Sequence, residues 1–144
     1  MIKGTIEILG RVIDIVLPLK YLKVYGIEEK HYYLTTGGVG SVMRQVMKEM
    51  LEFKQMWLRT ESYSGGTSIK VFFEELNNYK LSKSIGDWFE YGSFNPMEDL
   101  YEIKGTRNIL KLENGVDVNC DTKFCFVTND IPWDIKHKRE RVSA

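Results

Sequence analysis

The stretch that decides the fold is ESYSGGTSIK, residues 61–70. Two adjacent glycines, Gly65 and Gly66, stand at its centre, and glycine adopts the positive φ angles of tight turns at little steric cost. Strand-forming residues flank the glycines on both sides. The stretch therefore predicts a β-hairpin with strands over Trp57–Tyr63 and Ile69–Phe73. Its hydroxyl groups are interpreted as solvating the turn, with no reactive centre there.

Before this hairpin, apolar residues recur at the spacing i, i+3, i+4, i+7 and i+8 that marks one face of a helix. The pattern predicts a helix over Val39–Leu51, with Thr36 in a position to cap its first turn. A second helix is predicted from about Leu81 to Tyr91, with Gly92 as its C-terminal cap. The Met-rich apolar face of the first helix would sit on the sheet. Its residues are Val39, Val42, Met43, Val46, Met47, Met50 and Leu51.

Alternating and β-branched segments predict the other strands. Asn114-Gly115, between alternating residues, indicates a hairpin with a type I′ turn. A helix over Arg11–Lys23 is the alternative near the N-terminus, but Pro18 would lie in its middle and cost about 3 kcal/mol. The predicted strands are Thr5–Ile8, Val12–Leu17, Leu19–Tyr25, His31–Leu34, Leu100–Lys104 and Lys123–Thr128.

The chain has 144 residues, of which 43% are hydrophobic, and this is enough for one domain with a substantial core. We expect the fold class α+β, with a mostly antiparallel sheet of about five to seven strands and two helices packed on one face. The domain is predicted over residues 1–133. Residues 134–144 are basic and hold few large apolar side chains, which indicates a flexible tail.

Twenty acidic and twenty basic residues give a net charge of zero. A protein that binds duplex DNA usually has a basic excess, and a DNA mimic needs an acidic one. No apolar run reaches the length of a transmembrane span, and charged residues interrupt the apolar start of the chain. We therefore expect a cytoplasmic protein. Cys120 and Cys125 are expected as thiols, with a bridge between them left open as an alternative.

Three patterns partly match sites of known chemistry. Residues 35–41, TTGGVGS, precede a predicted helix as a phosphate loop does, but they lack its lysine. Glu102 and Lys104 match half of a metal-dependent nuclease site, for which Asp117 could supply the second carboxylate. A zinc site would need four ligands at a loose spacing. These are Cys120, Cys125, His31 and His137.

None of these patterns is complete, and neither histidine follows the spacing of a serine hydrolase. We therefore expect no catalytic residue, no metal ligand and no cofactor. An enzyme that acts on a nucleotide-like substrate, with TTGGVGS and SYSGGTS as anion-binding loops, is the third and weakest functional hypothesis.

Two segments carry a resemblance to a known family. One is the strand pair RTESYSGGTSIKV, residues 59–71, and the other is FEYGSFNPMEDLY, residues 89–101. The chain from Val39 to Val127 resembles a small domain associated with large polyvalent proteins of phages and conjugative elements. It departs from the family pattern at residues 73–77, where a Trp-x-Asp-Gly-Pro turn is missing, and residues 1–38 have no counterpart. The matched positions are Arg59, Glu61, Ser62, Tyr63, Ser64, Gly65, Gly66, Ser68, Ile69, Val71, Phe89, Gly92, Phe94, Asn95, Met97, Asp99 and Tyr101.

The resemblance implies a mobile genetic element, such as a phage, as the setting, and it carries over no catalytic residue. We expect a non-enzymatic protein that binds a host or element-encoded protein and inhibits a host factor or an antiviral defence system. Arg59, Tyr63 and Tyr79 are the expected anchors, because arginine and tyrosine dominate binding hot spots. The oligomeric state is left open.

The alternative is a nucleic-acid-binding module that uses the basic tail and an aromatic sheet face. In the tail, the binding residues would be Lys136, Lys138 and Arg139. On the sheet, the stacking residues would be Tyr63, Phe72, Phe73 and Tyr79, if exposed.

Overall fold

The computed structural model describes residues 1–63, 66–90, 109–122, 124–128 and 131–135. Within these residues the chain forms two helices, α1 (Thr36–Met50) and α2 (Tyr79–Phe89), and a short 3-10 helix over Leu19–Tyr21. The strands are β1 (Ile2–Ile8), β2 (Arg11–Leu17), β3 (Leu22–Tyr25), β4 (His31–Leu34), β5 (Gln55–Tyr63), β6 (Gly66–Glu74), β7 (Ile109–Leu112), β8 (Asp117–Asn119) and β9 (Phe124–Thr128).

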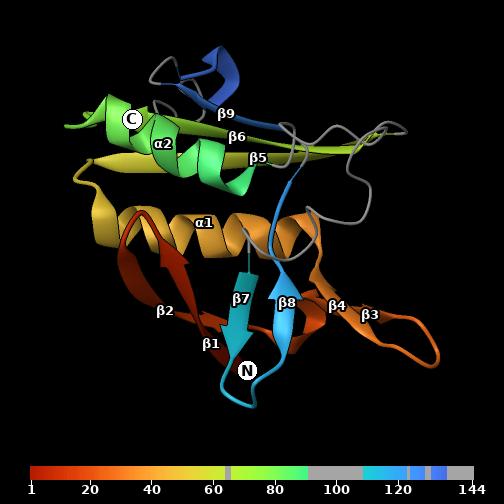
Figure 1. Ribbon diagram of the computed structural model, residues 1–144. Coiled ribbons are helices and arrows are strands. Elements are labelled where there is room, and N and C mark those ends of the chain that lie inside the picture. Colours follow the sequence, from red (N-terminus) through yellow and green to blue (C-terminus); the bar gives the residue numbers. More distant parts are fainter. Residues whose placement is uncertain (64–65, 91–108, 123, 129–130, 136–144) are drawn as a thin grey trace, which may run out of the picture.

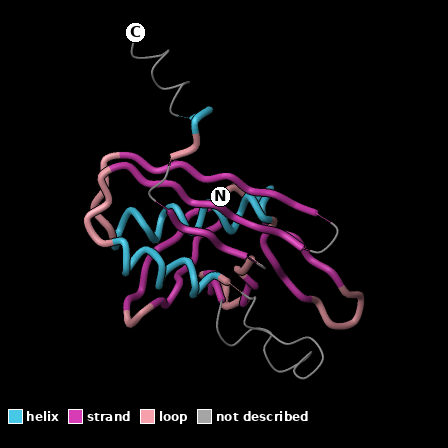
Figure 2. The backbone as a smooth tube through the Cα atoms, turned by 90° about the horizontal axis from the view of Figure 1, so that it is seen from above, coloured by secondary structure: helices cyan, strands magenta, loops and turns pink. Residues whose placement is uncertain are grey.

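The strands form two sheets with α1 between them (Figure 1). The large sheet has the strand order β2-β1-β7-β8-β4-β3, and the small sheet has the order β5-β6-β9. Figure 2, the view from above, shows the long strands of the small sheet passing over α1. The helix contacts β2 and β4 on one side and β5 and β6 on the other. Because both sides of α1 are covered by sheet, the core is continuous through the domain.

The α+β class, the two helices and the mostly antiparallel pairing are confirmed. The pairs β4–β8 and β6–β9 are parallel, and all others are antiparallel. Both helices lie on one face of the small sheet. On that face Ile69 and Val71 of β6 are fully buried, and their partners on β9, Cys125 and Val127, lie against Gly86 of α2. The strands are divided over two sheets, a feature that the sequence patterns do not specify.

The β5–β6 hairpin follows the prediction made from the paired glycines. Its two strands pair in register from Gln55 opposite Glu74 to Tyr63 opposite Gly66, which leaves only positions 64 and 65 to connect them. The side chains of Met56, Ile69, Val71 and Phe73 are buried. Because Met56 pairs with Phe73, and Ile69 and Val71 lie two and four residues before Phe73, these side chains share the face of the hairpin that packs against α1. A shift of the register by one residue would move the side chains of one strand to the other face.

The predicted cap of α1 is wrong by one residue. The N-cap is Thr35, whose hydroxyl accepts a hydrogen bond from the backbone N–H of Gly38 at 3.2 Å. Thr36 is the first helical residue instead. Gly38 is needed for packing, because a Cβ there would lie 2.8 Å from the Cβ of Tyr21 and 3.2 Å from that of Leu34. The glycines of this segment thus let the helix start close to the 3-10 helix.

Two further predicted elements, a strand and the second helix, have different bounds in the structure. The predicted strand over Leu19–Tyr25 begins only at Leu22, because Pro18 is followed by the 3-10 helix. The second helix ends at Phe89 with Glu90 as its C-cap; the predicted cap Gly92 lies outside the described residues. The predicted strand over 100–104 also lies outside them.

The turn between β7 and β8 forms at the predicted place but is not of type I′. The N–H of Gly115 donates to the carbonyl of Leu112 at 2.9 Å, so the central residues are Glu113 and Asn114. Of these three loop residues only Gly115 has a positive φ, of 87°. Asn114 instead accepts a hydrogen bond from the N–H of Val116 through its side chain. The loop is therefore a turn followed by a left-handed glycine, the common three-residue hairpin.

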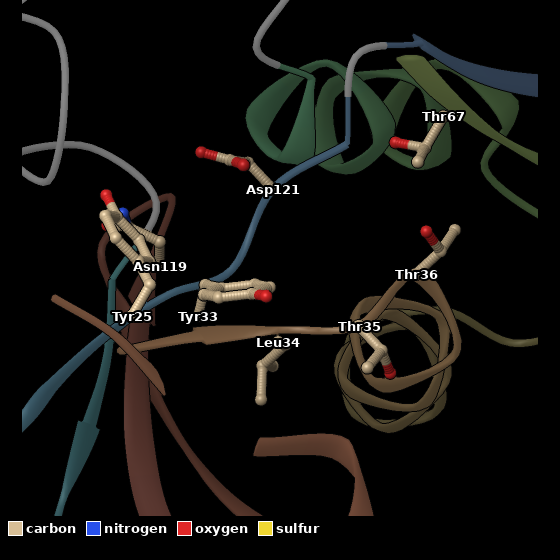
Figure 3. A pocket seen from close by; sticks show the side chains of 8 residues that line it. All are labelled: Tyr25, Tyr33, Leu34, Thr35, Thr36, Thr67, Asn119 and Asp121. Carbon is tan, nitrogen blue, oxygen red and sulfur yellow. The ribbon is translucent and has the colours of Figure 1, made fainter. Parts of the chain in front are cut away.

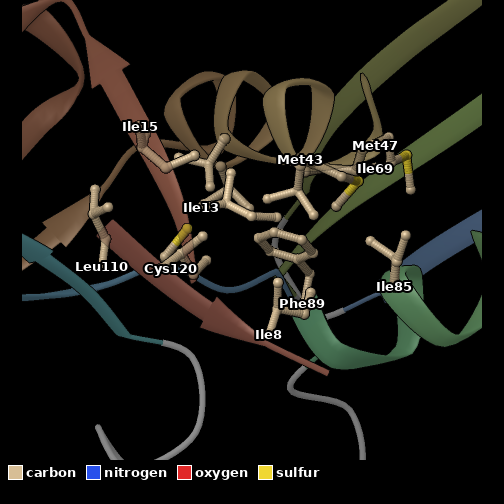
Figure 4. Packing of buried hydrophobic residues seen from close by; sticks show 14 of the residues in the cluster. Ile8, Ile13, Ile15, Met43, Met47, Ile69, Ile85, Phe89, Leu110 and Cys120 are labelled. Carbon is tan, nitrogen blue, oxygen red and sulfur yellow. The ribbon is translucent and has the colours of Figure 1, made fainter. Parts of the chain in front are cut away.

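The centre of the core lies where α2 ends. The ring of Phe89 is fully buried and lies among Ile8 and Ile13 of the large sheet and Met43 of α1 (Figure 4). This one side chain therefore links the second helix to the large sheet. Of the described helices, none is both long and apolar enough to cross a membrane.

Candidate functional site

A pocket of about 350 Å³ opens where the two sheets and the start of α1 meet, and we call it the junction pocket (Figure 3). Four stretches of the chain supply its lining, and seven of the eight lining side chains carry a polar group. Tyr33 points to the side of β4 on which Asp121 and Thr67 lie, whereas Leu34 points to the opposite side. The lining residues are Tyr25, Tyr33, Leu34, Thr35, Thr36, Thr67, Asn119 and Asp121.

The chain segment that crosses from β8 to β9 holds one wall of the junction pocket. Thr122 in this segment is buried, and its hydroxyl lies 3.1 Å from the hydroxyl of Thr67 and 3.3 Å from the carbonyl of the same residue. The backbone N–H of Thr122 donates to the carbonyl of Phe89 at 3.0 Å. These bonds tie the crossover to both β6 and α2, so Asp121 is held in place at the pocket wall.

The carboxyl group of Asp121 at the pocket wall has a shifted pKa. Burial raises its pKa from 3.8 to about 6, because the charged form loses contact with water. Above pH 6 the pocket therefore holds a poorly solvated negative charge. A basic group from a ligand or partner would be the natural neutraliser of this charge.

The pH dependence of Asp121 can be tested through stability. Between pH 3.8 and about 6 the folded chain holds a proton that the unfolded chain has released, so stability falls as the pH rises through this range. We expect Asp121→Asn to be more stable than the wild type above pH 6, by about 1–3 kcal/mol, and equally stable near pH 4. Urea unfolding at several pH values measures this difference. The exposed Asp117→Asn variant is the matched control. A constant offset at all pH values would contradict the assignment.

Next to the pocket, the β3–β4 hairpin projects from the body of the domain (Figure 1). Tyr25 stacks on His31 with a centroid distance of 5.0 Å and lies 5.7 Å from the ring of Tyr33. Tyr25 is 47% exposed and Tyr33 38% exposed, while Ile27 at the tip is 94% exposed. We call Tyr25, Ile27, His31 and Tyr33 the hairpin patch. Tyr25 and Tyr33 belong to both the patch and the junction pocket.

The structure does not bring the predicted anchors together. Arg59 lies on β5, forms an ion pair with Asp134, and places its guanidinium 6.0 Å from the ring centroid of Phe72. Tyr79 starts α2 and donates from its hydroxyl to the carbonyl of Val127 on β9 at 2.9 Å. The two residues are therefore at opposite edges of the small sheet. The backbone of Tyr63 ends β5; Lys136, Lys138 and Arg139 lie outside the described residues.

The aromatic sheet face expected for nucleic-acid binding is partly wrong. Phe72 is 7% exposed and Phe73 is 1% exposed, so neither ring is available to stack on bases. Phe126 and Trp133, which the sequence analysis did not single out, are well exposed instead. Lys70, which pairs with Phe126, is opposite Arg59 on β5. A row of two basic residues and one aromatic residue thus crosses the small sheet.

Cys120 and Cys125 are both buried and free, so they do not form a disulfide bond with each other. Burial, with the charge of Asp121, raises the pKa of Cys120 well above its ordinary value. Burial, with the nearby carboxylates of Glu90 and Asp87, raises the pKa of Cys125 to about 12. Both are therefore protonated, whereas metal binding and nucleophilic attack need the thiolate. Among the described residues no cluster of three or more potential metal ligands is present.

The phosphate-loop segment contributes Thr35 and Thr36 to the junction pocket, but the amide of Gly38 is already bonded to the Thr35 hydroxyl. The carboxyl of Asp121 on the same pocket would repel an anion. Of the nuclease pattern, Asp117 is exposed on β8, and Glu102 and Lys104 lie outside the described residues. The segment TTGGVGS is therefore not a free anion-binding loop, and it does not support the nucleotide hypothesis.

Comparisons of this chain with protein-family models, with curated proteins and with solved structures gave no significant match. The resemblance to the polyvalent-protein domain accordingly stays a prediction from the sequence. Sequence reasoning missed the junction pocket, because Thr67 and residues 119–121 are distant along the chain from the rest of its lining. The hairpin patch did leave a signal in the sequence, because the ring-bearing residues Tyr25, His31 and Tyr33 lie within nine residues of one another.

Proposed function

We propose that the protein acts by binding another protein, without catalysing a reaction, and that the hairpin patch is its principal contact surface. The observation that carries this proposal is the exposed aromatic and aliphatic cluster on a projecting hairpin. Aromatic side chains are enriched in the centres of protein interfaces, because they bury a large area at a small cost in conformational entropy. The mutual stacking of Tyr25 and His31 lowers this cost further by holding the rings in place.

The junction pocket gives the proposed partner a defined chemistry. A partner segment that covers Tyr25 and Tyr33 would reach the pocket that both residues line. Asp121, Asn119 and the hydroxyls of the pocket are hydrogen-bond acceptors, which suits a lysine or arginine side chain. The proposed partner therefore presents an apolar surface beside one basic side chain.

The biological setting of this proposal rests on the sequence resemblance. A domain of phages and conjugative elements is placed to meet host proteins, including components of antiviral defence. Inhibition of such a protein needs only a stable complex, and both cysteines are protonated, so neither is available as a nucleophile. We propose a host factor of this kind as the partner.

A capture experiment tests this function. The immobilised protein is exposed to a nuclease-treated host lysate, and the affinity of each captured protein is then measured for wild type, Tyr25→Ala and Ile27→Asp. Because hot-spot residues contribute about 2 kcal/mol or more, we expect each substitution to weaken binding at least tenfold. Val12→Asp is the control, since Val12 is also exposed and apolar but lies on β2, far from the hairpin in the sheet order.

A captured protein whose affinity is unchanged by both hairpin substitutions would contradict the proposed surface.

A second candidate, nucleic-acid binding, is favoured only by the row of Arg59, Lys70 and Phe126 on the small sheet. It predicts capture that depends on intact nucleic acid and weakens steeply with salt. Lys70→Glu would then abolish capture while Tyr25→Ala leaves it intact.

A further inference from the structure

The two sheets have four edges, and the described side chains cap two of them. On β9, the carboxylate of Glu90 accepts from the N–H of Cys125 at 3.2 Å, and Tyr79 donates to the carbonyl of Val127. On β2, the amide of Gln45 accepts from the N–H of Val16 at 3.0 Å and donates to its carbonyl at 2.9 Å. These side chains occupy backbone groups that would otherwise pair with a further strand.

A third edge, β3, is short, with four residues. The fourth edge is β5, with nine residues. Tyr63 and Gly66 flank the two-residue connection of the hairpin, and such a flanking pair exchanges backbone hydrogen bonds. The N–H and C=O groups of the odd-numbered residues of β5 therefore point to β6. The N–H and C=O groups of the even-numbered residues, such as Leu58 and Thr60, point away from the sheet. Among the described residues, no backbone hydrogen bond outside the β5–β6 ladder reaches the outward groups of Leu58 and Thr60.

The charges along this edge are self-complementary. Arg59 and Glu61 flank Thr60, and all three are at least partly exposed. If two copies of β5 pair antiparallel about Thr60, each Arg59 lies opposite Glu61 of the other copy. Opposite charges in direct cross-strand positions favour a register, and like charges oppose it. Pairing about Arg59 would instead place two arginines face to face.

We propose that β5 is a self-association edge, which pairs antiparallel with β5 of a second copy about Thr60 and joins the two small sheets into one. The backbone hydrogen bonds of the even-numbered residues supply the contact, and the two Arg59–Glu61 pairs select the register. The charge of Arg59 is shared with Asp134, and Glu61 lies 3.8 Å from Lys70, so both side chains already lie along the sheet surface. On the inner face, the methyl carbon of Thr60 would lie 3.6 Å from a Cβ at Gly40 of α1, so the helix and the strand are close together there.

A charge-reversal pair tests the partner and the register together. In the proposed dimer, position 59 of each copy lies opposite position 61 of the other copy. Arg59→Glu would therefore place glutamate opposite glutamate, and Glu61→Arg would place arginine opposite arginine. We expect each variant alone to associate at least tenfold more weakly than the wild type in sedimentation equilibrium. An equimolar mixture restores both ion pairs, so it is expected to associate to within about threefold of the wild type.

Thr60→Pro gives an independent check, because it removes an outward N–H and leaves the odd-numbered bonds to β6 intact. It is expected to be monomeric, while the control Thr60→Val stays dimeric. A wild type that is monomeric at its highest attainable concentration would overturn the proposal. So would a dimer that neither reversal weakens, or a mixture that recovers no association. If Thr60→Pro does not fold, the mixing experiment still decides.

Discussion

Phe89→Ala is expected to lower the free energy of unfolding by about 3–5 kcal/mol, the range for removal of a buried phenylalanine. The ring has no exposed surface and lies between α2, α1 and the large sheet (Figure 4). Its removal leaves a cavity that these elements cannot fill by local movement, because each is fixed by its own strand or helix pairing. Urea unfolding followed by circular dichroism measures the loss. Since domains of this size have a total stability of about 5–15 kcal/mol, the variant is expected to be partly unfolded at 37 °C.

Trp88→Ala is the matched control for this prediction. Trp88 is the adjacent aromatic residue, contacts Phe89 edge to face at 5.0 Å, and is only half-buried. Its removal deletes a larger side chain at the same end of the same helix, but water can occupy part of the space. We expect a clearly smaller loss of stability. If both variants lose the same free energy, the helix end and not the buried ring is responsible.

Gly86→Leu is expected to cost about 3 kcal/mol, at the upper end of the range for overpacking. A Cβ at this position would lie 2.8 Å from Cγ2 of Val127 and 3.2 Å from the sulfur of Cys125. A whole leucine would therefore force α2 away from β9. Glycine within a helix costs about 1 kcal/mol relative to alanine. At Gly86 this cost is accompanied by a close contact between α2 and β9. Thermal and urea unfolding measure the difference.

The steric cause can be separated from other effects of leucine on the helix. Lys83→Leu places the same side chain on the exposed face of α2 and should change stability by less than about 0.5 kcal/mol. Combining Gly86→Leu with Val127→Ala makes room at the contact, so the double variant should lose less than the sum of the two single losses. Additive losses would show that the contact with Val127 is not the cause.

Local periodicity predicts the elements of this fold well. The seven apolar residues from Val39 to Leu51 predicted α1, because a helix face repeats within the segment itself. Gly65-Gly66 predicted the β5–β6 hairpin, because both strands are adjacent along the chain. The errors lie at element ends, such as the cap at Thr35, where one hydroxyl competes with its neighbour for the same role.

The arrangement of the elements could not be predicted in this way. The parallel pairs β4–β8 and β6–β9 join segments more than 50 residues apart, and no pattern within either segment specifies its partner. The apolar face of α1 is wide enough to contact two sheets, but the sequence alone does not distinguish a second sheet from one larger sheet. The junction pocket depends on these distant pairings, so its residues could not be selected from the sequence.

The place of β7 and β8 in the large sheet has a consequence for synthesis on the ribosome. The hairpin β1–β2 and the hairpin β3–β4 emerge first, yet within the large sheet they are joined only by β7 and β8, which follow much later in the chain. At a translation rate of about 5–20 residues per second, the two early hairpins wait for seconds without the strands that join them. During this interval α1, which is made directly after β4, can cover one face of the hairpins, but the edges of β1 and β4 stay unpaired, so the nascent chain is most vulnerable to wrong strand pairing just before its last strands are made.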